Sequence, residues 1–165
     1  MAKTEYNYDI VRSFVNWSIV WGVVAVLVGV IVSFQMIEPG LNFPPYLTFG
    51  RLRPIHTNAG IYGWGVGAIF ATFLYMVQRL CKTSLWSPKL ARFQLWFFNA
   101  TIIASAVTLL LGYTTSKEYH EMEWPIDLMV IVLWVVFTLN ILMTIFKRKE
   151  ERMYISLWYM MASLI

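Results

Sequence analysis

Four long segments without a charged side chain limit what this chain can fold into. They cover residues 13–37, 57–78, 93–116 and 128–146, and they are 19 to 25 residues long. An α-helix needs about 20 predominantly apolar residues to cross the hydrocarbon core of a bilayer. Charged residues make up 13% of the chain, about half the share in a typical soluble domain. The pattern predicts a polytopic membrane protein.

A fifth apolar run covers residues 153–165 and is 13 residues long. At about 1.5 Å per residue, it is too short for a full crossing. We therefore expect an all-α membrane helix bundle with four complete spans and the start of a fifth. Residues 1–165 would then be the N-terminal part of a single, longer membrane domain. The alternative is a short tail at the membrane surface.

The basic residues are divided unevenly between the two predicted sides of the membrane. If the N-terminus is cytoplasmic, ten of the 13 lysines and arginines lie inside, and three lie outside: Arg51, Arg53 and Lys117. Loops on the cytoplasmic side of membrane proteins carry the excess of Lys and Arg. We therefore expect a cytoplasmic N-terminus. The net charge of +4 then requires no nucleic-acid partner, and the expected surroundings are membrane lipid.

The stretch from Arg51 to Asn58 carries the strongest chemical signal, because it leads directly into the second uncharged segment. The imidazole of His56 can ligate a haem iron, and the guanidinium groups of Arg51 and Arg53 can bind haem propionates at the membrane surface. The alternative is an interfacial histidine beside two arginines that extend toward water. A single cysteine, Cys81, excludes a multi-thiolate metal site, and without a C-x-x-C-H motif any haem is bound non-covalently.

The second span also carries small residues at helical spacing from the histidine. Steps of four and three residues from His56 reach Gly60, Gly63, Gly67 and Ala71. Glycine inside a helix costs about 1 kcal/mol relative to alanine, so a stripe of glycines needs a reason. One reason is a flat macrocycle lying along the helix; the other is close approach of a second helix, as in Gly-x-x-x-Gly motifs. Both interpretations stay open.

Three further residues belong to the start of this span. Pro54 suits the first turn of a helix, where its missing N–H does no harm. Thr57 and Asn58 can cap the helix start or orient the imidazole through a hydrogen bond.

An acidic cluster is expected on the same side of the membrane as the two arginines. Glu118, Glu121 and Glu123 lie in the connection between the third and fourth uncharged segments. Opposite charges at one surface can form a solvated salt-bridge patch. They can also surround haem propionates, with a carboxylate that holds a bridging cation.

Three blocks of the sequence resemble subunit I of the cbb₃-type cytochrome c oxidases, which belong to the haem–copper oxidase superfamily. They are residues 49–59 (FGRLRPIHTNA), residues 116–127 (SKEYHEMEWPID), and the basic run 147–149 followed by Tyr154, Ile155 and Trp158. The resemblance is collinear over nearly the whole chain. It implies that His56 is an axial ligand of a low-spin haem b, that Arg53 pairs with a propionate, and that Glu118 belongs to a calcium site.

The resemblance also implies a function for the complete subunit. It would take electrons from c-type cytochrome and pass them through the low-spin haem to an oxygen-reducing centre of high-spin haem b and copper. That reaction is coupled to proton pumping in a bacterial inner membrane, and the partners are the c-type cytochrome subunits and a cytochrome c donor. The family's remaining metal ligands match no position here, so we expect no catalytic residue and no activity from this segment alone. The alternatives are a nitric oxide reductase catalytic subunit and a non-enzymatic membrane scaffold or transporter.

Overall fold

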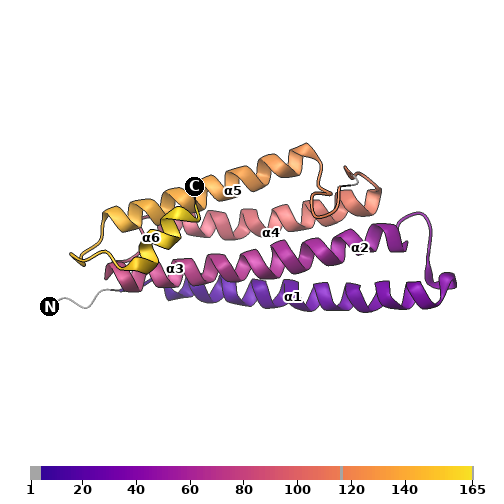
Figure 1. Ribbon diagram of the computed structural model, residues 1–165, viewed down its shortest axis with the longest axis horizontal. Helices are drawn as coiled ribbons and strands as arrows, with labels where there is room; N and C mark the ends of the chain where they lie inside the picture. Colours follow the sequence, from indigo (N-terminus) through magenta and orange to yellow (C-terminus); the bar gives the residue numbers. More distant parts are fainter. Residues whose placement is uncertain (1–4, 116, 165) are drawn as a thin grey trace.

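Long helices dominate the computed structural model, which describes residues 5–115 and 117–164 (Figure 1). Helix α1 covers Tyr8–Ile37, and α2 (Phe49–Asn58), the π-helical segment η2 (Ala59–Val66) and α3 (Gly67–Cys81) follow one another without a break. They are followed by α4 (Pro88–Leu111), α5 (Trp124–Phe146) and the short α6 (Ile155–Ala162); a 3₁₀ turn, η1, covers Pro39–Leu41. The described residues contain no strand.

Four of these helical stretches are long and apolar enough to cross a membrane. They are Tyr8–Ile37, Phe49–Cys81, Pro88–Leu111 and Trp124–Phe146, with lengths of 30, 33, 24 and 23 residues. The predicted all-α bundle with four complete spans is confirmed, and α6 lies within the fifth apolar run. The protein is a multi-pass membrane protein.

The connections place the two arginines and the acidic loop at the same end of the bundle. α1 ends and α2 begins at this end, and α4 ends and α5 begins there as well (Figure 1). We call it the arginine end. α2 contacts both α1 and α4, and α4 lies along α5. The connection between α1 and α2 and the connection between α4 and α5 are therefore neighbours.

The second span begins earlier than the sequence suggested, and the expectation for Pro54 is wrong. The helix starts at Phe49, so Pro54 lies inside α2 instead of in its first turn. Proline there removes the hydrogen bond that its N–H would give to the carbonyl of residue 50. Tertiary packing compensates for this loss, because Leu52 and Ile55 are buried against Val32 of α1 and Leu109 of α4.

α1 and the second span pack antiparallel along a seam in which small residues of one helix face side chains of the other, and we call it the α1–η2 seam. Its members from α1 are Ser18, Trp21, Gly22, Ala25 and Gly29, and those from the second span are His56, Gly60, Gly63, Trp64 and Gly67. A Cβ added at Gly63 would lie 2.8 Å from Cβ of Trp21, and one at Gly22 would lie 3.2 Å from Cδ1 of Trp64. The two backbones thus approach as closely as glycine allows.

The π-helical turns of η2 lie in this seam. In a π-helix the backbone hydrogen bonds join residues five apart instead of four. In a membrane, any backbone group that is left without a helical partner must find one inside the protein. Ser18 supplies one such partner, because its Oγ donates a 2.8 Å hydrogen bond to the carbonyl oxygen of Trp64. Trp21 adds a link to α4, donating from Nε1 to Oδ1 of Asn99 at 2.9 Å. The seam is fixed by polar contacts as well as by shape.

Both helix ends at the acidic loop follow from local sequence. α4 stops at Gly112, whose φ of 91° lies in the left-handed region that side-chain-bearing residues rarely adopt. α5 starts at Trp124 with Pro125 as its second residue, as expected from the tolerance of a first helical turn for proline.

Candidate haem-ligand site at the arginine end

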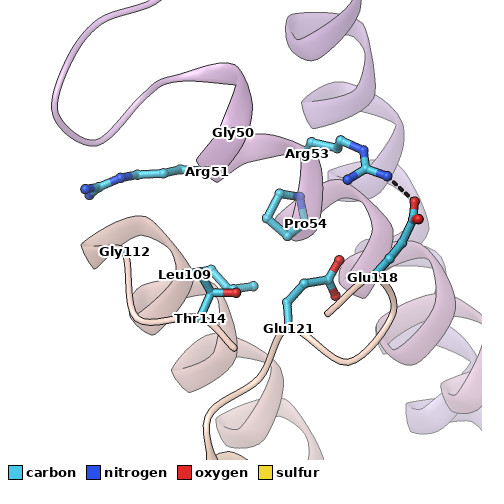
Figure 2. A pocket seen from close by; sticks show the side chains of 9 residues that line it. All are labelled: Gly50, Arg51, Arg53, Pro54, Leu109, Gly112, Thr114, Glu118 and Glu121. Carbon is cyan, nitrogen blue, oxygen red and sulfur yellow. Dashed lines mark hydrogen bonds and ion pairs between the residues drawn. The ribbon is translucent and has the colours of Figure 1, made fainter. Parts of the chain in front are cut away.

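A polar pocket of about 390 Å³ opens at the arginine end of the bundle (Figure 2). Residues from α2, from the end of α4 and from the acidic loop line it: Gly50, Arg51, Arg53, Pro54, Leu109, Gly112, Thr114, Glu118 and Glu121. The structure thus brings together both arginines and two of the three predicted glutamates.

The two arginines point in different directions from the wall of this pocket. Figure 2 shows Arg51 extending over Gly112 and Arg53 extending toward Glu118. Nη1 of Arg51 donates a hydrogen bond to the carbonyl of Leu110, and its guanidinium lies 5.8 Å from the centre of the Tyr46 ring. A cation at this position satisfies a carbonyl that the end of a helix leaves free and opposes the negative end of the helix dipole.

Arg53 forms an ion pair with Glu118 at the mouth of the pocket. Both side chains are about half exposed, at 47% and 58%. An exposed pair of this kind contributes about 0–1 kcal/mol to stability, so neither charge is locked in place. Both remain accessible to a charged group that enters the pocket.

Glu121 and Asn58 form a second polar contact, deeper in the structure. Glu121 is 6% exposed, and its Oε2 accepts a 3.2 Å hydrogen bond from Nδ2 of Asn58. The same Nδ2 also donates to the carbonyl of Pro54 at 2.7 Å. Oδ1 of Asn58 is buried with no hydrogen-bond partner among the described residues. The described residues contain no group of three His, Cys, Asp or Glu side chains that could hold a metal ion.

His56 lies one turn deeper than Arg53, in the α1–η2 seam. It is half-buried, and its Nδ1 donates a hydrogen bond to the carbonyl oxygen of Ala25, with 2.8 Å between the two atoms. Nε2 has no hydrogen-bond partner within the part of the chain that the structure describes. A histidine that ligates a metal commonly donates its other ring N–H to a carbonyl or carboxylate, which fixes the tautomer and the ring orientation. His56 has this arrangement.

Thr57 and Asn58 do neither of the things expected of them. Both lie inside α2, where Oγ1 of Thr57 donates to the carbonyl of Arg53 at 3.0 Å and Asn58 makes the contacts described above. They neither cap the helix start nor contact the imidazole, because the helix begins at Phe49 and the ring faces α1. The partner of the imidazole is a main-chain oxygen, which no side-chain motif reveals.

The glycine stripe predicted below His56 faces α1. A Cβ added at Gly60 would lie 3.8 Å from Cβ of Ala25, and one at Gly67 would lie 3.3 Å from both Ser18 and Phe98. Together with Gly63 against Trp21, these contacts are those of close helix packing. The α1 side of this packing, Gly22 and Gly29, was missed, although the two glycines lie seven residues apart with Ala25 between them. That spacing on one helix face is the signal that could have identified them.

Comparison with known proteins covers nearly the whole chain. The family described as Cytochrome C and Quinol oxidase polypeptide I matches residues 9–165. The chain is 45% identical to the cbb₃-type cytochrome c oxidase subunit CcoN1 of Stutzerimonas stutzeri, over 96% of this chain and 34% of that protein. It is 40% identical to a cytochrome c oxidase subunit 1 homolog of Agrobacterium tumefaciens (strain T37), over 99% of this chain and 30% of the relative.

A third relative, cytochrome c oxidase subunit 1 of Rhodobacter capsulatus, is 38% identical over 99% of this chain and 32% of its own length. The chain thus spans about a third of the length of these relatives. The resemblance seen in the three sequence blocks is confirmed over almost every residue, and the chain belongs to the cytochrome c and quinol oxidase polypeptide I family, subunit I of the haem–copper oxidases.

Proposed function

We propose that this chain is the N-terminal membrane part of the catalytic subunit of a cbb₃-type terminal oxidase, in the inner membrane of a bacterium with its N-terminus in the cytoplasm. The complete subunit would accept electrons from c-type cytochromes and reduce oxygen at a centre of high-spin haem b and copper, coupled to proton pumping. This segment would contribute one axial ligand of the low-spin haem b, which relays single electrons when bound. The other oxidase subunits and the cytochrome c donor are the partners in this proposal.

The geometry of His56 carries the proposal. Its Nδ1 is held by the Ala25 carbonyl, and its Nε2 has no partner among the described residues. A neutral imidazole in this tautomer presents its Nε2 lone pair to a metal. Gly60, Gly63 and Gly67 contribute by letting α1 approach closely enough for its backbone to reach the ring.

The two arginines that line the pocket at the arginine end support the proposal that the carboxylates of a haem bind there. Arg53 and Arg51 can bind propionates there, since guanidinium groups pair with carboxylates through charge-assisted hydrogen bonds. The exposed Arg53–Glu118 pair can open to admit such a group at little cost, because exposed ion pairs are weak. The calcium site expected at Glu118 belongs to the same proposal, with the carboxylate of Glu121 lining the same pocket.

Two alternatives are less well supported. The relatives described above are all named as cytochrome c oxidase subunits, which favours an oxidase over a nitric oxide reductase. A scaffold without haem would not require His56 to leave its Nε2 without a partner among the described residues.

The test is a reduced-minus-oxidised optical spectrum of membranes that contain the full-length protein. The chain has two histidines, His56 in the seam and His120 in the acidic loop. His56→Ala should remove the low-spin haem b band, because an axial ligand is lost, while His120→Ala should keep it. A band of normal intensity in His56→Ala, at wild-type protein level, would contradict the proposal.

A further inference from the structure

Where the His56 ring lies against α1, it meets the backbone of Ala25 and Gly29. The Ala25 carbonyl accepts from Nδ1 at 2.8 Å, and Gly29, one turn later, presents no side chain to the ring. A Cβ built on Gly29 would lie 2.7 Å from Cε1, 2.8 Å from Nδ1 and 3.4 Å from Nε2 of His56. All three of these atoms belong to the imidazole, and the two shortest distances are closer than real Cβ contacts allow.

Helix geometry explains why a glycine at this position exposes that carbonyl. In an α-helix the Cα–Cβ bond tilts toward the N-terminus, so the side chain of a residue covers the turn before it. Residue 29 therefore covers the carbonyl of residue 25. A carbonyl oxygen has two lone pairs, and one remains for an outside donor after the helical hydrogen bond is made. Without a side chain at position 29, that lone pair is open to His56.

The ring is consequently fixed in two ways by the same helix turn. The hydrogen bond selects the tautomer with the proton on Nδ1, and the flat glycine surface sets how the ring can lie along α1. A side chain at position 29 would push the ring away from the Ala25 carbonyl. Nδ1 would then lose its acceptor, and the direction of Nε2 would change.

We propose that Gly29 is a positioning residue for His56: its lack of a side chain lets the imidazole reach the Ala25 carbonyl and aims Nε2 at the iron of the low-spin haem. This inference rests on the proposed function and extends it to a residue of α1. Loss of a group that orients a metal-ligating histidine typically weakens metal binding about 10–100-fold. Gly29→Ala should weaken retention of the low-spin haem to a similar extent.

The experiment compares Gly29→Ala with Gly22→Ala in the full-length protein. Gly22 lies on the same helix in the same seam, where an added Cβ meets Trp64 at 3.2 Å and touches no atom of His56. The readouts are the low-spin haem content per protein, the midpoint potential of that haem and the g-values of its electron paramagnetic resonance signal. Gly29→Ala should lose low-spin haem or shift its potential and g-values, and Gly22→Ala should match the wild type in all three.

Two results separate failure of this inference from failure of the proposed function. If His56→Ala keeps the low-spin band, the proposed function is wrong. If His56→Ala loses the band but Gly29→Ala and Gly22→Ala both resemble the wild type, Gly29 does not position the ligand.

A double variant covers the case in which Gly29→Ala does not accumulate in the membrane. Combining it with His56→Ala removes the ring that the new Cβ would strike. The double variant should then accumulate to the level of His56→Ala alone. If it remains as poorly accumulated as Gly29→Ala, the defect arises elsewhere in α1 and the inference is overturned.

Discussion

The α1–η2 seam and the arginine end lie next to each other but hold their polar groups by different means. In the seam the partners are backbone atoms and buried side chains: the Ala25 carbonyl for His56, the Trp64 carbonyl for Ser18, and Asn99 for Trp21. At the arginine end, Arg53 and Glu118 are about half exposed, and the contact that their side chains make among the described residues is the ion pair between them. The seam is a preorganised support, whereas the exposed Arg53–Glu118 pair can rearrange around a ligand.

The largest effect on stability is expected at Gly63, where an added Cβ would meet the aromatic side chain of Trp21. Gly63→Ala would place a Cβ 2.8 Å from Cβ of Trp21. The Trp21 side chain cannot move away without disturbing its hydrogen bond to Asn99 of α4. Overpacking of this kind costs about 1–3 kcal/mol. The thermal unfolding midpoint of the purified full-length protein should fall clearly.

The control for Gly63→Ala is Gly50→Ala, because an added Cβ at Gly50 has nothing within 4 Å. Gly50→Ala should leave the unfolding midpoint unchanged or raise it slightly, since alanine is the better helix former. Equal losses in the two variants would show that the seam is looser than described.

A smaller effect is expected from the hydrogen bond that joins the seam to α4. Trp21→Phe keeps an aromatic ring but removes the Nε1 donor to Asn99. Hydrogen bonds between membrane helices are worth on average about 0.6 kcal/mol, so a loss of this order is expected from thermal unfolding. The double variant Trp21→Phe/Asn99→Leu should lose less than the sum of the two single changes, and strict additivity would show that the bond contributes nothing.

The smallest effect is expected at the arginine end. Glu118→Gln removes the ion pair with Arg53, which is worth about 0–1 kcal/mol because both groups are exposed. The difference in unfolding midpoint from the wild type should be small at low salt and should disappear as salt is added. A loss as large as that of Gly63→Ala would mean that the pair is part of the rigid support, and the contrast between the two regions would not hold.

The sequence was sufficient for the bundle but not for the geometry around the histidine. Uncharged runs of membrane length predicted the four spans, because the hydrocarbon core leaves few alternatives for such segments. The start of the second span was placed too late, since burial of Leu52 and Ile55 outweighs the helix-breaking tendency of Pro54. Arg51, Arg53 and Glu118 were correctly expected at one end, but Arg51 turned toward the end of α4, a contact that depends on how two distant helices meet.

The main-chain acceptor of His56 has a consequence for genetics. No substitution at position 25 deletes a carbonyl oxygen, so a change of side chain at the acceptor residue itself would not remove this contact. A main-chain acceptor likewise requires no polar side chain at position 25. The residue of α1 whose identity depends on this contact is Gly29, four positions after Ala25. In this helix, the informative position is the one at which the chain carries no side chain.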